Sequence, residues 1–313
     1  MAQIACIGEV MIELATAEAA GDGSERKALS YAGDTYNTVV TLARLGAHAS
    51  YVTRLGDDHY SDAIVQRLQS EQIATDSIVR QAGKVPGLYM IHNSPDGERE
   101  FFYWRDRAPA RELFASEEEI SVLESQLADT QMLYLSGITL AIISETSRQN
   151  LLVFLRRFKE RGGKVAFDSN YRPRLWQNPK QAQQANRELL AVTDLALLTL
   201  DDEQLLWGDE GDAIEAVKAR YSNCDINEIV LKRGAEDVVI LKGQERLAVE
   251  VPKVTNIVDT TAAGDTFNAG YLAANLAGAS PQECARQANR CAGIIIRHRG
   301  GVIDKQVFLS QLS

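Results

Sequence analysis

The sequence lacks any long apolar run, and no stretch approaches the roughly 20 residues that a helix needs to cross a bilayer. It opens on a strand-like segment, residues 3–8, so we expect neither a signal peptide nor a membrane anchor. Positive charge is also in short supply, since 43 acidic residues outnumber 33 lysines and arginines and the net charge is −10. This balance argues against a nucleic-acid surface and predicts a cytoplasmic protein.

Cysteine and histidine are scarce, with four of each. The cysteines are Cys6, Cys224, Cys284 and Cys291, and the histidines are His48, His59, His92 and His298. Neither set has the spacing of a zinc site. We therefore expect buried or neutral thiols, as is usual in a reducing compartment.

Three common motifs of phosphate and acyl chemistry are missing. Gly163-Lys164 has neither the upstream glycine nor the following Ser or Thr of a P-loop. The first strand is followed by Gly8-Glu9 rather than by a glycine-rich dinucleotide loop, and Ser136-Gly137 lacks the earlier glycine of a nucleophile elbow. These absences weaken the P-loop ATPase, dehydrogenase and α/β-hydrolase interpretations.

What the chain does contain is a run of small residues, 259–264, that leads into Asp265 where a helix is expected to begin. Small side chains let backbone N–H groups approach a ligand, and a helix N-terminus attracts anions, most often phosphate. A carboxylate at such a place would repel phosphate unless it has a proton to remove. A phosphate cradle beside a proton acceptor is what phosphoryl transfer to an alcohol requires. The alternative is that Asp265 only caps the helix.

Strand-like and helix-like segments alternate over most of the 313 residues. The expected strands are 4–8, 48–55, 132–135, 164–167, 195–200 and 228–231, and the expected helices are 34–45, 60–72, 144–161, 180–191, 213–221, 265–277 and 281–297. This alternation predicts a single α/β domain, 1–313, with a mainly parallel central sheet flanked by helices on both faces.

Two stretches interrupt the alternation, because 11–14 and 77–104 have strand periodicity with no helix between them. Pro95-Asp96-Gly97 is a strong turn signal between the strand-like segments 88–93 and 100–104. We therefore predict a small antiparallel β sheet, inserted from about 10–32 and 76–108, that acts as a lid over the site.

Two segments carry a resemblance to a known family. The run Asp259–Gly270 resembles the C-terminal signature of the ribokinase-like (PfkB-type) sugar kinases, and Gly33–Asn37 with the helix that follows is similar to their N-terminal signature. The order and spacing of both agree, and the likeness extends over about residues 3–303. Ala32 and Ala262 stand where glycine is usual, but both are small. The resemblance implies a ribokinase-like fold.

Three further segments, 86–89, 102–105 and 167–176, resemble one branch of this family, the 2-keto-3-deoxygluconate kinases. That branch implies ATP-dependent phosphorylation of a sugar acid at its terminal (6-) hydroxyl, with Mg²⁺ bound to ATP. The alternatives are a kinase for a neutral sugar such as fructose or ribose, and a sugar-binding regulator that has lost catalysis.

The resemblance also implies roles for individual residues. Asp265 would be the base, and the N–H groups of Ala262, Ala263, Gly264 and Asp265 would form an anion hole. The implied sugar ligands are Gly33, Asp34, Asn37, Tyr89, Tyr103, Arg105, Arg172 and Asp265. Arginine donors suit a carboxylate or keto oxygen, whereas the plainer roles are surface ion pairs for the arginines and packing for the tyrosines.

On the nucleotide side the implied ligands are Asn170, Lys232, Arg233, Gly234, Ala235, Glu236, Asp237, Asn289 and the turn Ala262–Gly264. A solvated turn is the plainer interpretation of Lys232 and Arg233. Glu203 keeps the glutamate of the family's Asn-x-x-Glu element without its asparagine, and would contribute to Mg²⁺ or phosphate binding. A homo-oligomer formed through the lid is the implied assembly, with a small sugar acid as partner and with neither nucleic acid nor membrane.

Overall fold

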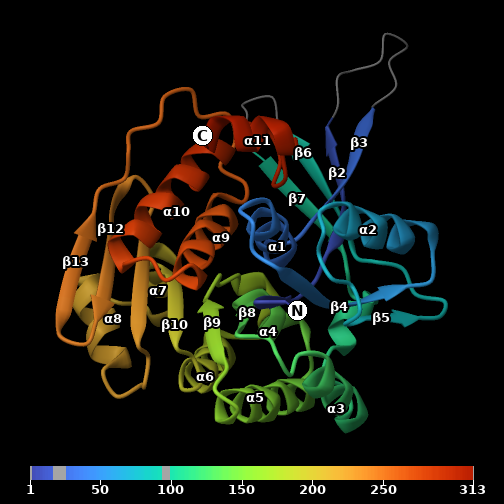
Figure 1. Cartoon of the computed structure of the whole chain (residues 1–313), viewed down its shortest axis with the longest axis horizontal. Coiled ribbons are helices and arrows are strands. Elements are labelled where there is room, and N and C mark those ends of the chain that lie inside the picture. The colour runs from blue at the N-terminus through green and yellow to red at the C-terminus, as the bar shows by residue number, and fades with distance from the viewer. Residues whose placement is uncertain (1, 17–25, 94–98, 313) are drawn as a thin grey trace.

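We describe a computed structural model of the chain, which places residues 2–16, 26–93 and 99–312 (Figure 1). A nine-stranded sheet forms its body, in the order β13-β12-β11-β10-β9-β8-β1-β4-β5. Its strands are β1 (Ile4–Ile7), β4 (Ala49–Gly56), β5 (Ile78–Gln81), β8 (Met132–Ser136), β9 (Lys164–Asp168), β10 (Leu195–Thr199), β11 (Glu228–Arg233), β12 (Glu236–Lys242) and β13 (Glu245–Val249). Neighbours from β5 to β11 run parallel, and β12 and β13 add an antiparallel edge.

Helices cover both faces of this sheet, as the alternation predicted (Figure 1). Successive β1 residues divide between two apolar cores, Ala5 and Ile7 on one face and Ile4 and Cys6 on the other. One face is covered by α1 (Asp34–Arg44), α2 (His59–Ser70), α9 (Ala263–Leu276) and α10 (Pro281–Ile295). The other face is covered by α3 (Glu117–Gln126), α4 (Gly137–Ile142), α5 (Glu145–Glu160), α6 (Pro179–Leu190), α7 (Leu200–Trp207) and α8 (Ala213–Tyr221). The C-terminal helix α11 (Lys305–Leu312) packs on α10.

Local sequence explains where several of these helices begin. Ser280 accepts a hydrogen bond from the Glu283 backbone while the Glu283 side chain accepts one from Ser280, and Pro281 occupies the first helical position of α10. Asp58 caps α2 in a similar way by accepting hydrogen bonds from the backbones of Tyr60 and Ser61. Such caps satisfy N–H groups that a helix leaves without partners.

The four strands of a second, smaller sheet are β2 (Met11–Thr16), β3 (Lys27–Ala32), β6 (Leu88–Asn93) and β7 (Arg99–Trp104), in the order β3-β2-β6-β7. Its outer pairs, β2 with β3 and β6 with β7, are antiparallel, whereas β2 and β6 are parallel. The predicted turn at Pro95-Asp96-Gly97 lies outside the described residues. β5 falls within the predicted insertion 76–108, yet it pairs with β4 in the large sheet because its apolar residues extend that core.

The carboxyl ends of the parallel strands all meet one edge of the large sheet. Short connections therefore bring polar residues together that are distant in sequence: Glu9 after β1, Asp168 at the end of β9, Asp202 after β10 and Lys232 near the end of β11. Ligands of open α/β sheets bind at this edge. The inner face of the small sheet, built on Met11, Ala32, Tyr89 and Ile91, adjoins it.

Candidate active site

A cavity of about 1070 Å³ lies between the small sheet and the carboxyl edge of the large one. Nearly all the residues expected at the site line it. These are Gly33, Asp34, Asn37, Tyr89, Tyr103, Arg105, Asn170, Arg172, Lys232, Arg233, Gly234, Ala235, Ala262, Ala263, Gly264, Asp265 and Asn289. Three do not: Glu203, Glu236 and Asp237 are absent from the lining.

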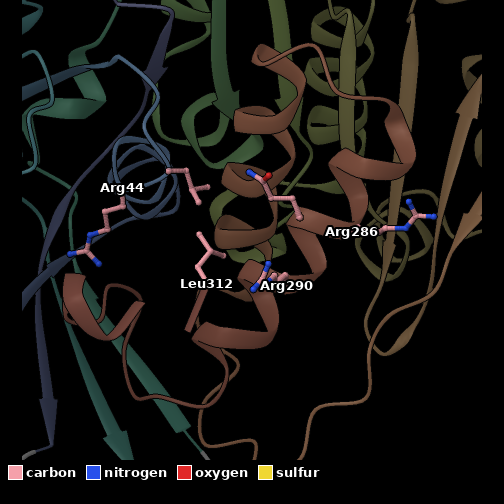
Figure 2. Close-up of a pocket in the computed structure, with 6 residues that line it drawn as sticks. Arg44, Arg286, Arg290 and Leu312 are labelled. Carbon is pink, nitrogen blue, oxygen red and sulfur yellow. The ribbon is translucent and has the colours of Figure 1, made fainter. Parts of the chain in front are cut away.

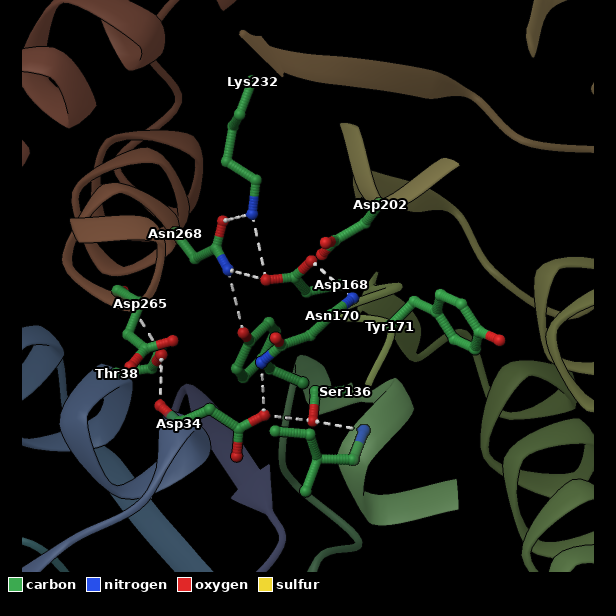
Figure 3. Close-up of polar contacts among 12 residues, drawn as sticks. Asp34, Thr38, Ser136, Asp168, Asn170, Tyr171, Asp202, Lys232, Asp265 and Asn268 are labelled. Atoms are coloured by element: carbon green, nitrogen blue, oxygen red, sulfur yellow. Dashed lines mark hydrogen bonds and ion pairs between the residues drawn. The ribbon is translucent and has the colours of Figure 1, made fainter. Parts of the chain in front are cut away.

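Asp265 occupies the first turn of α9 and faces the start of α1. The Asn37 side-chain amide donates a 2.8 Å hydrogen bond to the Asp265 carboxyl. Thr38 Oγ1 donates to the Asp265 carbonyl oxygen at 3.2 Å (Figure 3). Burial, reinforced by the nearby charge of Asp34, raises the pKa of Asp265 to about 8. The group therefore accepts a proton far more readily than an exposed aspartate does.

The turn that precedes α9 is shaped to expose backbone N–H groups. Asp259 accepts hydrogen bonds from the backbones of Thr261 (2.8 Å) and Gly300 (3.0 Å), which fixes the chain before the helix. Ala262 adopts a left-handed conformation, φ 59°, and the helix starts at Ala263. Since the first N–H groups of an α-helix have no intrahelical partner, those of Gly264 and Asp265 stand at the cavity wall as anion donors.

Asp34, at the first position of α1, accepts hydrogen bonds from three directions. The donors are the Ser136 hydroxyl and the Asn170 side-chain amide, the latter at 2.8 Å (Figure 3), together with the Thr35 backbone at 2.8 Å. Burial raises its pKa. Gly33 makes this placement possible, because a Cβ there would lie 2.2 Å from the Glu9 carbonyl oxygen.

Lys232 is a buried cation beside the turn. Its ammonium lies 2.9 Å from Asp168 and 3.0 Å from the Asn268 side-chain oxygen, and Asn268 in turn donates to Asp168 at 2.7 Å (Figure 3). A Cβ placed on Gly264 would be 3.9 Å from Lys232 Nζ. The ammonium is thus near the helix N-terminus, where positive charge and N–H donors combine.

The half of the cavity under the small sheet is rich in polar side chains. Arg105 forms a buried ion pair with Glu9, and the Tyr89 hydroxyl donates to Glu13. Burial raises the pKa of Glu9, although the Arg105 charge opposes this. Glu9 Oε1, Arg105 Nε and Asn37 Oδ1 are buried without a hydrogen-bond partner. Buried polar atoms require partners, so this half fits a ligand with several hydroxyl groups.

Arg172 is exposed and lies at the cavity edge. Its guanidinium is 3.4 Å from Asp202 and donates to the Tyr171 carbonyl oxygen at 2.8 Å. Burial raises the pKa of Asp202, and Arg172 opposes that rise. Both arginines expected to hold a substrate carboxylate therefore already face a protein carboxylate.

The opposite half of the cavity is largely apolar. It is bounded by the turn after β11 and by residues of the β13–α9 connection and α10; the apolar members are Val238, Val251, Pro252, Val254, Ile257, Ala292 and Ile296. Asn289 lies here and donates to the Glu250 carbonyl oxygen at 3.0 Å. Gly234, φ 61°, makes the tight turn between β11 and β12. This slot suits a flat aromatic ring such as a nucleobase.

Glu203 lies elsewhere. It is fully buried on α7, where it accepts a 2.7 Å hydrogen bond from Tyr221 and pairs with Arg220 at 3.3 Å. Burial raises its pKa to about 7. Glu236 and Asp237 begin β12, and Glu236 pairs with Arg233. In the described part of the chain no cluster of three or more acidic, histidine or cysteine side chains is arranged to hold a metal ion.

Sequence reasoning missed four residues of the site: Glu9, Asp168, Asn268 and Arg174. Glu9 and Asp168 each sit at the carboxyl end of a buried strand, and Asn268 lies three residues after Asp265 on the same helix. These positions were available signals for polar residues at the sheet edge. Arg174 belongs to segment 167–176, whose resemblance to one branch of the family was an available signal, and the structure places it at the cavity.

A second, smaller hollow of about 430 Å³ lies between α1, α10 and α11 (Figure 2). The Arg44 and Arg286 side chains on its rim point to opposite sides, and Arg44 is paired with Glu71 at 2.6 Å. These side chains do not converge on a common ligand. Among the residues described, no helix is both long and apolar enough to cross a membrane.

Comparison with known proteins gives a consistent result. The model of the pfkB family carbohydrate kinases matches residues 1–306. The 2-dehydro-3-deoxygluconokinases of Escherichia coli K12 and Dickeya dadantii are each 43% identical, over 97% and 96% of this chain and 98% and 96% of their own lengths. The structure of 2-dehydro-3-deoxygluconokinase from Thermotoga maritima superposes with a TM-score of 0.81 at 22% identity, covering 99% of this chain and 97% of that one. The resemblance of the two signature segments and the expected fold are both confirmed.

Proposed function

Because the chain belongs to the pfkB family of carbohydrate kinases, we propose that it transfers the γ-phosphoryl group of ATP to the terminal hydroxyl of 2-keto-3-deoxy-D-gluconate. The products are 2-keto-3-deoxy-6-phosphogluconate and ADP. The observation that carries the proposal is the place of Asp265: a half-buried carboxyl at a helix N-terminus, between a polar half-cavity and an apolar one. Relatives at 43% identity bear the name of this activity.

Asp265 acts as the general base. As the sugar's terminal oxygen forms its bond to the γ-phosphorus, its proton passes to the Asp265 carboxylate, and the bond from the γ-phosphorus to the bridging oxygen breaks to release ADP. Asn37 keeps the carboxyl oriented through its 2.8 Å hydrogen bond. The N–H groups of Ala262, Gly264 and Asp265 hold the charge of the transferred group. The Ala263 N–H, also expected in the anion hole, instead donates to the Thr260 carbonyl oxygen at 3.2 Å.

The residues present fit ATP and its Mg²⁺ in different ways. The apolar slot near Asn289 accepts the nucleobase, and Lys232, Arg233 and Gly234 lie between that slot and the anion hole. The described residues offer no cluster of metal ligands; Mg²⁺ bound to the phosphates of ATP would supply neutralisation of their charge. Glu203 takes no part in this proposal, because Tyr221 and Arg220 hold it inside α7 and α8.

A kinase for a neutral sugar is the alternative that one observation favours. Arg105 is paired with Glu9 and Arg172 with Asp202, so neither brings an unpaired charge to a substrate carboxylate. Fructose or ribose has no carboxylate, so either sugar would need only hydrogen bonds from the polar half of the cavity.

A substrate panel separates the two functions. Purified protein is assayed for ADP release with 2-keto-3-deoxygluconate, D-fructose and D-ribose at saturating MgATP. We expect kcat/KM for the sugar acid to exceed that for either neutral sugar by at least about tenfold, since a charge-assisted hydrogen bond contributes about 1.5–3 kcal/mol. A preference for fructose or ribose would reject the sugar-acid assignment. If none of the three sugars raised ADP release above the sugar-free blank, the remaining hypothesis would be a sugar-binding regulator that has lost catalysis.

We further propose that the small sheet is a lid and that two copies of the chain associate through its outer face. Side chains alternate along β7, so Tyr103 faces the cavity while Phe102 and Trp104 face outward with exposed fractions of 47% and 58%. Leu29, 46% exposed, lies on the same outer face in β3. Exposed apolar surface of this kind favours protein association. An ATP-dependent reaction and four free cysteines support a cytoplasmic location.

Charging that face should break the assembly. The variant with Phe102→Glu and Trp104→Glu is expected to elute as a monomer when light scattering gives the wild type the mass of a dimer or larger. Val122→Glu, at a position 49% exposed on α3, is the matched control and should leave the mass unchanged. A monomeric wild type, or a doubly charged variant with wild-type mass, would reject assembly through the lid.

A further inference from the structure

The cationic side chains that line the cavity differ in whether a protein carboxylate already neutralises them. Arg105 is paired with Glu9, Arg172 with Asp202, Lys232 with Asp168 and Arg233 with Glu236. Within residues 2–16, 26–93 and 99–312, only two of the cavity cations, Arg174 and Lys253, have no carboxylate partner. An anionic ligand gains most from a cation whose charge is not already matched.

The two unmatched cations lie in different halves of the cavity. Lys253 belongs to the connection before α9, beside Pro252 and Val254, in the apolar half. Arg174 belongs to the short 3₁₀ helix η2 (Pro173–Leu175) that follows β9, and its guanidinium carbon lies 4.2 Å from the centroid of the Tyr103 ring. Arg174 is thus the unmatched cation of the polar half.

The contact with Tyr103 crosses from the body of the protein to the lid. Tyr103 lies in β7, and its ring stacks on that of Tyr89 in β6 with the centroids 5.6 Å apart. Both tyrosines line the same cavity as Arg174. A cation–π contact of this kind occupies none of the guanidinium N–H groups in a hydrogen bond to an oxygen, so they stay available for the two oxygens of a carboxylate.

We propose that Arg174 binds the carboxylate of the sugar acid and is the residue that selects acids over neutral sugars. This inference rests on the proposed function and deepens it. Arg105 and Glu9 then act as a buried hydrogen-bonding pair for the sugar's hydroxyl and keto oxygens, in keeping with their unpartnered Nε and Oε1 atoms. Because Arg174 stands on the body and stacks on the lid, a carboxylate held there also ties the two together.

The test compares the sugar acid with its methyl ester, which keeps the shape and removes the charge. Binding of each to wild type, Arg174→Ala and Arg174→Lys is measured by calorimetry, and KM and kcat by ADP release. In wild type the acid should bind roughly 10- to 100-fold more tightly than the ester, as expected for bidentate charge-assisted hydrogen bonds. In Arg174→Ala that ratio should fall to within about threefold of unity, and the KM for the sugar acid should rise by a larger factor than kcat falls.

Arg174→Lys keeps the positive charge but loses the planar guanidinium with its paired N–H donors. The ratio of acid to ester affinity in this variant should therefore lie between those of wild type and Arg174→Ala. Arg187→Ala is the matched control: Arg187 also stacks on an aromatic ring, with its guanidinium carbon 4.6 Å from the Trp207 ring centroid, and it does not line the cavity. It should keep the wild-type ratio.

The outcomes separate two failures. If wild type phosphorylates the sugar acid and Arg174→Ala keeps the wild-type ratio of acid to ester affinity, the role of Arg174 is wrong and the proposed function stands. If Arg174→Ala weakens both ligands equally, the residue is structural and the inference is again wrong. If wild type releases no ADP with the sugar acid, the proposed function itself fails.

Discussion

Asp265→Asn is expected to lower kcat by about 10²–10⁴, the usual contribution of a positioned general base, while changing the affinity for the sugar acid only a few-fold. Asparagine has nearly the same shape and can still accept the hydrogen bond that Asn37 donates at 2.8 Å. It cannot take up the proton of the attacking hydroxyl. Single-turnover ADP formation measures the loss, and calorimetry with the sugar acid measures the affinity.

The same variant should change how stability depends on pH. Burial, together with the charge of Asp34, raises the pKa of Asp265 to about 8 in the folded protein, against about 3.9 for an unfolded aspartate. The protonated form is therefore favoured by folding, so the contribution of this group is full below pH 4 and is lost as pH rises toward 8. We expect Asp265→Asn to melt at a higher temperature than wild type, by a margin that grows from pH 5 to pH 8.5.

Wild-type kcat/KM should rise with pH below about 8, because only the ionised Asp265 accepts the proton. Two results would contradict this account of Asp265: an Asn variant with near wild-type kcat, or a melting difference that does not vary with pH.

Lys232→Met is expected to lower kcat by about 10²–10³, comparable to the loss of one donor from an oxyanion hole. The ammonium lies near the first turn of α9, where charge builds on the transferred group, as its 3.9 Å distance from a Cβ on Gly264 indicates. Steady-state and single-turnover ADP release measure the effect.

Loss of Lys232 also leaves Asp168 buried without its cation, which costs on the order of 3–5 kcal/mol. A second substitution separates folding from chemistry: Asp168→Asn together with Lys232→Met removes both charges and should recover most of the melting temperature, while kcat stays low. Lys180→Met, at an exposed lysine of α6 outside the cavity, is the control and should match wild type. Recovery of activity along with stability would show that Lys232 serves folding alone.

Much of the fold followed from local pattern. Buried strands alternating with helices define a parallel sheet, and the expected boundaries of the helices over 34–45, 144–161 and 281–297 differ from α1, α5 and α10 by two residues or fewer. Long-range pairing was not readable in this way. The parallel contact of β2 with β6 joins Ile12 to Leu88, and nothing local in either strand specifies that partner.

The site shows the same division. Asp265 and its turn were predicted from sequence because the small residues of the turn and the carboxylate lie in one continuous segment, 259–265. Arg105 was expected to be a substrate ligand, with a surface ion pair as its plainer role. The structure instead pairs it in the interior with Glu9, 96 residues earlier, and only the fold brings the two together. Glu203 could have been placed from the sequence, since Leu200, Glu203 and Leu206 recur at helical spacing and form the buried face of α7.

The position of the phosphate on the product tests the central claim most directly. Wild-type protein, MgATP and 2-keto-3-deoxygluconate labelled with ¹³C at its terminal carbon are followed by ³¹P and ¹³C magnetic resonance. A phosphomonoester whose phosphorus couples to the labelled terminal carbon, formed by wild type and not by Asp265→Asn, is the predicted result. A phosphate on another oxygen, or the same product made at an equal rate by Asp265→Asn, would contradict it.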